Sequence, residues 1–395
     1  MCMPHFTRVS YLGFAAFGIF WGTWGALLPA LREQASLDDA QLGVALVFVG
    51  AGALPAMLLS GRAVDRLGPQ VTGFALIGLG IAAALVGILA HDALSASLAM
   101  LLLGAASGAA DVAINSLAGF AEQQSGTRVI TRSHAVFSTF VVAGSLAAGA
   151  LRSLGTPTPV IFASVATVIA AEGIAVAVIL RAPPPIKTGS APSSRATAGV
   201  RWLMPFALVG LVGALAFAVE NAHQSWGAVF LQQEIGATVG LTALAPATFA
   251  ALSSVTRFVT SYARGLPPDG LLLGGAVIAC GGTLLVAASQ TVIVALAGLA
   301  VAAVGTSVLF PTLLSSATKD VSADRRGRAT SAIGTIAYLG FLAGPAYVGF
   351  LAGAFGLRSA MIGVAALSLA FAILCIPLRR VWIQRTNPTI TTANS

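Results

Sequence analysis

The chain has 395 residues, of which 57% are hydrophobic and only 9% are charged, and its mean hydropathy is +0.91. Soluble proteins carry about 25% charged residues, so this composition excludes an ordinary soluble domain and indicates an integral membrane protein. The cysteines Cys2, Cys280 and Cys375 have no paired or metal-ligand spacing, so we expect neither a disulfide framework nor a zinc site.

Apolar stretches long enough to cross a bilayer recur along the whole sequence. A span needs about 20 residues, which leaves room for about twelve helices with short connections. We therefore expect an all-α membrane protein with spans near residues 9–31, 41–61, 70–90, 95–118, 132–152, 158–180, 202–231, 239–262, 270–288, 291–316, 328–352 and 357–378. A cleavable signal peptide is not expected, because Met1–Arg8 is short and mixed in character.

The 21 basic residues are distributed unevenly between the connections. The termini and alternate connections hold Arg8, Arg62, Arg66, Arg128, Arg132, Arg181, Lys187, Arg195, Arg201, Arg264, Lys319, Arg325, Arg326, Arg328, Arg379, Arg380 and Arg385. The other connections hold only Arg32, Arg152 and Arg358. Because basic residues accumulate in cytoplasmic loops, both termini are predicted to be cytoplasmic. The net charge of +8 is thus explained by orientation, and nucleic acid is not an expected partner.

A polar segment divides the chain into two similar halves. Residues 182–201 are rich in proline and serine and read as a cytoplasmic linker, between six-helix bundles at residues 1–181 and 202–378 and before a tail at residues 379–395. The tripeptide at Trp24 recurs at Trp226, at corresponding places in the two halves. This repetition predicts two parallel six-helix pseudo-repeats, an architecture found among secondary transporters.

The fourth span carries an acid in an otherwise apolar, small-residue helix. At about 100° per residue, Gly104, Gly108, Asp111, Asn115 and Glu122 fall on one stripe. The glycines allow close approach of a neighbouring helix. A carboxylate at mid-bilayer is costly, so Asp111 should face a cavity or a partner. It is either a proton- or substrate-binding group or a structural partner of a neighbouring helix.

The connection after the second span carries a recognisable motif. Residues 61–68 read GRAVDRLG, and this G-x-x-x-D-R-x-G pattern resembles the signature loop of the major facilitator superfamily. The resemblance implies two bundles that rock around a central cavity, with a conformational switch formed by Gly61, Asp65, Arg66 and Gly68. Arg257 belongs to the equivalent region of the second half, where the aspartate is missing, and is expected to be an ion-pair partner.

Within that superfamily, the chain is similar to the fucose-permease-like group of bacterial inner-membrane proteins. The similarity lies in Asp111–Asn115 (DVAIN) and Ser133–Ser138 (SHAVFS). In sugar–proton symporters of this group, an acid in the fourth helix is followed four residues later by asparagine. The resemblance implies that Asp111 couples protons or binds sugar, with Asn115 as its hydrogen-bonding neighbour.

Further polar residues mark the first, fifth and seventh spans. On the fifth, His134, Ser138 and Ser145 form a stripe that can face the fourth helix, although His134 also suits a helix terminus. The seventh holds a second candidate for proton coupling, Glu220. Candidate substrate-binding residues are His134, Asn221, His223, Gln224, Trp226, Trp21 and Trp24. Trp24 and Trp226 also suit an interfacial belt. Glu172 in the sixth span has no polar neighbour one turn away and reads as structural.

We expect a secondary transporter that works by alternating access, as a proton-coupled symporter of a neutral polar solute such as a sugar. The alternative is a proton-coupled exporter of metabolites or toxic compounds. The fifth helix lacks the proline-bearing signature of many antiporters, which disfavours export. No enzyme motif, cofactor or metal site is expected. The expected partners are a small solute, protons and lipid, and the expected state is a monomer in the bacterial inner membrane.

Overall fold

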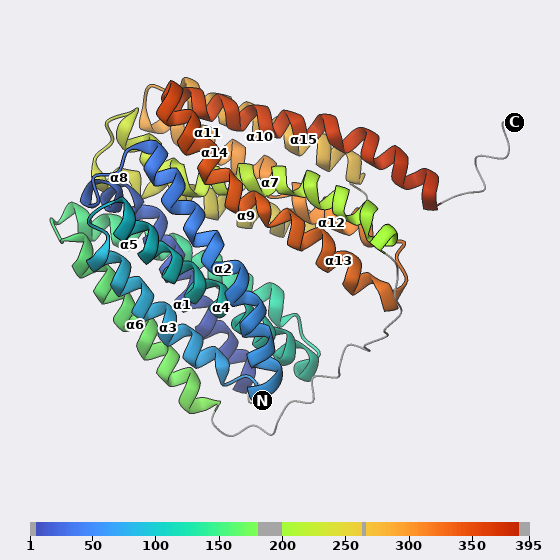
Figure 1. The fold of residues 1–395 in the computed structure, drawn as a ribbon, viewed down its shortest axis with the longest axis horizontal. Coiled ribbons are helices and arrows are strands. Elements are labelled where there is room, and N and C mark those ends of the chain that lie inside the picture. The colour runs from blue at the N-terminus through green and yellow to red at the C-terminus, as the bar shows by residue number, and fades with distance from the viewer. Residues whose placement is uncertain (1–4, 181–199, 263–265, 387–395) are drawn as a thin grey trace, which may run out of the picture. The chain divides into compact units, whose positions relative to one another are not determined.

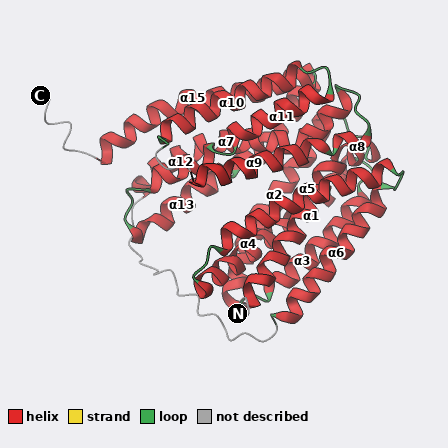
Figure 2. Ribbon diagram, turned by 180° about the vertical axis from the view of Figure 1, so that it is seen from behind, coloured by secondary structure: helices red, strands yellow, loops and turns green. Residues whose placement is uncertain are grey.

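The computed structural model describes residues 5–180, 200–262 and 266–386, which hold helices and no strand (Figures 1 and 2). The first helices are α1 (His5–Gln34), α2 (Asp39–Leu67), α3 (Val71–Leu89), α4 (Ala93–Ser125), α5 (Val129–Ser153), α6 (Thr158–Ile179) and α7 (Val200–Gln233). The others are α8 (Val239–Thr242), α9 (Leu244–Tyr262), α10 (Pro268–Ala288), α11 (Val292–Thr306), α12 (Leu309–Thr318), α13 (Ala323–Ala337), α14 (Leu339–Phe355) and α15 (Leu357–Thr386).

These helices form 12 candidate membrane spans within the described residues, which confirms the predicted all-α membrane fold. The eighth span, Val239–Tyr262, has the predicted bounds, whereas the first reaches from His5 to Gln34 and exceeds its prediction at both ends. The helix α15 continues through part of the predicted tail. Most of the predicted linker, residues 182–199, lies outside the described residues, as do residues 181 and 387–395.

Three spans consist of two helices each, joined by a local break. The eighth is interrupted at Ala243, the tenth at Ser307 and Val308, and the eleventh at Tyr338. Apolar periodicity continues through all three breaks, so the sequence predicts single helices there. Breaks inside a span are tolerated where the freed backbone groups find partners or line a cavity. In the tenth span, the carbonyl oxygen of Ser307 accepts a hydrogen bond from Arg257 Nε at 3.2 Å.

The chain divides into two compact units. The first comprises Met1–Gly189 and Gln224–Ala251, and within it α2 packs on α4, α1 on α5 and α3 on α6. The second comprises Ser190–His223 and Leu252–Ser395, where α10 packs on α11 and α15. The predicted halves, in contrast, meet only at the linker. The helices α7 and α9 are each expected within one half, but each contributes residues to both units. The two-bundle division stays a prediction.

Glycines bring α2 and α4 into backbone contact. A Cβ atom added at Gly104 would fall on the carbonyl oxygen of Val49, and one added at Gly52 would fall on that of Leu101. At Gly108 an added Cβ would lie 2.7 Å from the carbonyl oxygen of Ala53. The predicted small-residue stripe therefore packs against α2, which is the closest kind of helix association available in a membrane.

Replacing Gly104 by alanine should strongly destabilise the protein, because its Cβ atom would overlap with backbone atoms of α2. Overpacking typically costs about 1–3 kcal/mol, and backbone overlap places this change at the upper end. Thermal melting in detergent measures the loss. The matched control is Gly119→Ala on the same helix, where an added Cβ meets no atom within 4 Å. Equal melting temperatures for the two variants would contradict the packing.

The helix α4 begins with a capping box. Asp92 Oδ1 accepts a hydrogen bond from the Ser95 amide at 2.8 Å, and Ser95 Oγ accepts one from the Asp92 amide at 3.1 Å. The backbone hydrogen bond from Ser95 lowers the pKa of Asp92 below its ordinary value of 3.8. A lowered folded-state pKa means that the ionised group stabilises the fold above the unfolded pKa, and that this contribution disappears as the pH falls through the folded-state pKa.

An Asp92→Asn variant should therefore melt below the wild type at neutral pH, because asparagine caps the helix without the charge. The difference should narrow as the pH falls below 3.8 and the wild-type carboxyl becomes protonated. Paired melting curves from pH 7 downwards measure this. A difference that grows on acidification would refute the role given to the ionised cap.

Candidate functional site

The half-buried carboxylate of Asp111 lies in the middle of α4. Asn115, one turn later, donates from Nδ2 to Asp111 Oδ1 at 3.0 Å and to the Asp111 carbonyl oxygen at 2.9 Å. The ion pairs of the described residues do not include Asp111. The neighbouring residue Ile114 packs against Gly13 of α1, and Val112 lies beside Gly61 of α2. The predicted Asp111–Asn115 pair is thus formed, without a cation beside it.

Glu122 falls on the same predicted stripe as Asp111, but it contacts the next helix, α5. Its Oε2 accepts a hydrogen bond from the Ile130 amide at 3.0 Å, so it caps the beginning of α5. A carboxylate at a helix N-terminus satisfies a free amide and favours the helix dipole. Glu122 is therefore occupied in connecting α4 to α5.

The motif at residues 61–68 is helical, which corrects its prediction as a loop. Helix α2 continues through Asp65 and Arg66 to Leu67, and Gly68 caps it with φ 80°, a conformation that favours glycine. The predicted span ends at residue 61, but no residue between 61 and Gly68 breaks a helix, so α2 extends through the motif. Asp65 and Arg66 are exposed, and the ion pairs of the described residues include neither. The predicted conformational switch stays a prediction.

In the second unit, α7 and α9 are joined by an ion pair. Arg257 Nη2 lies 2.8 Å from Glu220 Oε1, and the Arg257 side chain is 45% exposed whereas that of Glu220 is 9% exposed. Arg257 also donates from Nε to the Ser307 carbonyl oxygen at the break between α11 and α12. The expectation that Arg257 pairs with an acid matches this geometry. The pair neutralises the charge of Glu220 and joins three spans.

The polar residues that follow Glu220 on α7 point to different neighbours. Asn221 donates from Nδ2 to the Phe341 carbonyl oxygen at 3.0 Å. His223 is buried, with Nδ1 2.7 Å from the Val219 carbonyl oxygen and Nε2 3.0 Å from Thr283 Oγ1 on α10. Both ring nitrogens are thus engaged by protein groups. Gln224 is exposed, and its role in solute binding stays a prediction.

An aromatic cluster lies one turn before Glu220. The ring of Phe217 lies 4.2 Å from that of Phe310 on α12 and 4.6 Å from that of Phe341 on α14, centroid to centroid. Tyr338, at the break between α13 and α14, lies 5.5 Å from both Phe217 and Phe341. The sequence reasoning missed this cluster. The sequence carries no signal for this cluster, because its members lie on different spans, two of them next to breaks that only the structure locates.

In the first unit, the aromatic residues of α1 lie against α5. Trp21 is half-buried with edge contacts to Phe17 and Phe20, and Trp24 is buried with its ring stacked on Phe20. His134 is exposed near the beginning of α5, and its ring meets that of Phe14 edge-on at 5.0 Å. Trp21 and His134 are therefore the accessible members of the predicted set on these two helices.

Ser145 and Trp226 are both buried. Ser145 Oγ donates to the Ala243 carbonyl oxygen at 2.6 Å. It therefore provides a hydrogen-bond partner for the backbone at the break between α8 and α9, and it does not face α4 as expected. Trp226 has no exposed surface, and its Nε1 has no hydrogen-bond partner in the described part of the chain. Its predicted role in solute binding or at the membrane interface stays a prediction. Short-range periodicity cannot tell which neighbour a helix face will meet.

Glu172 is the other acid inside a span. It lies in α6, and its Oε2 is buried without a hydrogen-bond partner among the described residues. The adjacent Gly173 packs against Gly73 and Ile77 of α3. The described residues also contain no group of three His, Cys, Asp or Glu able to hold a metal ion. Within the described spans, the candidate residues therefore supply carboxylates, amides and an imidazole that can hydrogen-bond.

Two known proteins of similar sequence carry the name of transporters without further characterisation. An uncharacterised MFS-type transporter of Yersinia pestis is 29% identical over 367 residues, which cover 91% of this chain and 92% of that protein. An uncharacterised transporter of Sinorhizobium fredii is 28% identical over 381 residues, covering 93% of this chain and 97% of that protein. The relatives thus match over nearly their whole length.

Solved structures show the same fold at low sequence identity. A bacterial homologue of the human lysosomal transporter Spinster has a TM-score of 0.76 at 16% identity, with 97% of this chain and 99% of that chain covered. The nucleoside transporter NupG has a TM-score of 0.72 at 14% identity, covering 95% and 99%. The E. coli fucose:proton symporter FucP has a TM-score of 0.61 at 17% identity, covering 94% and 98%.

A known family also matches most of this chain. The profile of the Major Facilitator Superfamily matches residues 9–323 and 264–393. The protein is therefore a multi-pass membrane transporter and not an enzyme. The chain belongs to the major facilitator superfamily.

Proposed function

We propose that this transporter is a proton-coupled symporter of a small neutral polar solute such as a sugar. The observation that carries the proposal is Asp111, a half-buried carboxylate within a span whose hydrogen-bond partner is an amide and which has no ion pair among the described residues. Protonating an acid that has no cation beside it leaves no unpaired positive charge inside the membrane. Such a group can respond to a proton gradient.

Glu220 suits coupling less well than Asp111. Arg257 compensates its charge at 2.8 Å, so protonating Glu220 would leave the arginine without its counter-ion. Coupling requires a group whose protonation differs between the conformational states or changes when the solute binds. Asp111 meets this requirement without breaking a pair, and Glu220 is the second candidate.

The proposed solute is neutral because the polar groups are mostly charge-compensated or uncharged. Asn115, Asn221 and Gln224 offer amides, which hydrogen-bond hydroxyl groups. The basic side chain beside Glu220 is that of Arg257, and it already pairs with Glu220, which disfavours an anionic solute. The neighbouring cluster of Phe217, Phe310, Tyr338 and Phe341 offers apolar surface for the faces of a ring-shaped solute. We also propose that the protein acts as a monomer in the bacterial inner membrane with both termini cytoplasmic.

The second candidate function is proton-coupled export of metabolites or lipophilic compounds. Export would use the same fold and the same carboxylates as symport. The aromatic cluster around Phe217 suits a lipophilic cargo. The direction of transport and the class of cargo distinguish the two. The exporter predicts binding of lipophilic cations, whereas the symporter predicts binding of neutral hydroxylated solutes.

A melting-shift screen of the full-length protein in detergent tests this function. The panel holds neutral sugars, nucleosides, amino-acid derivatives and lipophilic cations, each at two pH values, with wild type, Asp111→Asn and the matched control Glu172→Gln. A pH-dependent shift with a neutral solute that Asp111→Asn loses and Glu172→Gln keeps is the expected result. Shifts with lipophilic cations alone would replace the symporter by the exporter. An unchanged Asp111→Asn response would move coupling to Glu220.

A further inference from the structure

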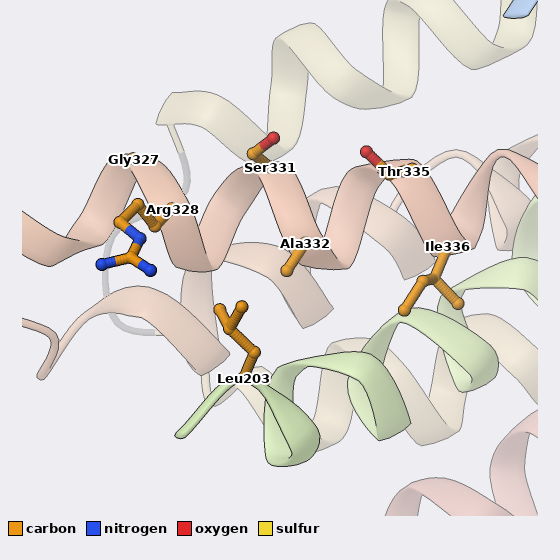
Figure 3. Close-up of a pocket in the computed structure, with 7 residues that line it drawn as sticks. All are labelled: Leu203, Gly327, Arg328, Ser331, Ala332, Thr335 and Ile336. Atoms are coloured by element: carbon orange, nitrogen blue, oxygen red, sulfur yellow. The ribbon is translucent and has the colours of Figure 1, made fainter. Parts of the chain in front are cut away.

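An open cleft of about 530 Å³ lies between the beginning of α7 and helix α13 (Figure 3). Its lining residues are Leu203, Gly327, Arg328, Ser331, Ala332, Thr335 and Ile336. Binding sites for small molecules and cofactors typically have volumes of about 300–1,000 Å³. The cleft is lined by none of the residues assigned above to proton coupling or solute binding, so its chemistry is a separate question.

The two sides of α13 in this cleft differ in polarity. Arg328, Ala332 and Ile336 extend toward the side on which Leu203 of α7 lies, whereas Ser331 and Thr335 point the other way (Figure 3). From Arg328 to Ile336 the helix rises about 12 Å. The side that faces Leu203 is therefore a long apolar wall with a guanidinium at one end. A ligand that matches it has an acidic group at one end and an extended apolar body.

The charged end is held by an aromatic residue at the beginning of α7. The guanidinium carbons of Arg325 and Arg328 lie 5.8 Å and 6.0 Å from the centre of the Trp202 ring. Arginines above an indole face are attracted by its π electrons. Tryptophan and clustered arginine are typical of the membrane interface, and the distribution of basic residues predicts that this end is cytoplasmic.

We propose that this cleft binds an anionic phospholipid of the cytoplasmic leaflet. The phosphate pairs with Arg328, and one acyl chain lies along Leu203, Ala332 and Ile336. Charge complementarity favours this occupant, because anionic lipids are concentrated in that leaflet and basic pockets between spans at its surface bind their headgroups. A small water-soluble anion would satisfy the arginine but leave the apolar wall uncovered.

Native mass spectrometry of the purified full-length protein, titrated with phosphatidylglycerol or phosphatidylethanolamine, tests the site. Wild type should bind phosphatidylglycerol more tightly than the zwitterionic lipid. Removing one cation near a headgroup should weaken that binding, so Arg328→Gln is expected to bind it about five-fold less tightly. The matched control is Arg326→Gln, because Arg326 Nη2 contacts the carbonyl oxygens of Lys319 and Val321 and lies outside the cleft lining.

A second variant tests the apolar wall without changing the charge. Ala332→Phe fills the cleft and should weaken binding of phosphatidylglycerol at least as much as Arg328→Gln. Equal binding of the two lipids to wild type, or equal losses in Arg328→Gln and Arg326→Gln, would overturn the proposal. Displacement of the lipid by glycerol 3-phosphate at similar concentration would overturn it in favour of a soluble anion. Because lipid binding is measured without transport, the result is independent of the proposed symport.

Discussion

Replacing Asp111 by asparagine should abolish solute-driven proton uptake while leaving the protein folded. Asparagine keeps the shape and the hydrogen bond to Asn115 but cannot exchange a proton, so solute binding loses its link to the proton gradient. The measurement uses proteoliposomes loaded with a pH-sensitive dye, to which the solute identified by the melting screen is added. We expect acidification of the lumen with wild type and none above background with Asp111→Asn, at unchanged melting temperature.

Glu172→Gln is the matched control for this experiment, because Glu172 is also an acid inside a span but lies in α6. It should acidify the lumen like wild type. Counterflow of labelled solute, which needs no net proton movement, should persist in Asp111→Asn if the residue serves coupling alone. Proton uptake retained by Asp111→Asn would refute the assignment, and loss in both variants would show that any neutralised acid in a span stops transport.

Breaking the Glu220–Arg257 pair should clearly destabilise the protein. In Arg257→Leu, Glu220 keeps only 9% of its side chain exposed and loses a partner at 2.8 Å, and Ser307 loses its hydrogen bond. Removing one member of a fully buried pair costs about 3–5 kcal/mol. Since the Arg257 side chain is 45% exposed, we expect a smaller loss, of about 1–3 kcal/mol. Thermal melting in detergent measures it.

Removing both charges together separates pairing from a direct role in transport. The double variant Glu220→Gln with Arg257→Gln leaves no uncompensated charge, so it should recover most of the melting temperature that Arg257→Leu loses. If Glu220 also binds the solute, the double variant should be stable and inactive. A single Arg257→Leu variant that melts like wild type would mean that the pair contributes nothing to stability.

Most of the fold is predictable because a bilayer imposes a simple length and polarity on each span. A run of about 20 apolar residues has one solution in lipid, a helix, which explains why all twelve spans lie where the composition places them. The breaks at Ala243, Ser307 and Tyr338 were not predictable. Their freed backbone groups depend on distant partners, such as Ser145 for Ala243 and Arg257 for Ser307, and no local pattern reports such a partner.

The candidate site divides in the same way. The contact of Asp111 with Asn115 follows from a spacing of one helical turn within a single helix, and it is formed as predicted. The partner of Arg257 lies on another helix, so sequence reasoning reached an ion pair but not Glu220. The buried environments of His223 and Trp226 depend on which neighbours cover α7, and amphipathic periodicity is weak in a helix that is apolar on most sides.

The reciprocal glycine contacts between α2 and α4 have a mechanical consequence for any transport cycle. Because Gly52 meets the Leu101 carbonyl while Gly104 meets the Val49 carbonyl, sliding either helix along the other would drive backbone atoms into one another. The two helices must therefore travel as a locked pair, and Asp111 keeps a constant register with the GRAVDRLG end of α2. Under the proposed coupling role of Asp111, a movement of α4 would therefore carry the GRAVDRLG end of α2 with it, and the packing between the two helices would not change.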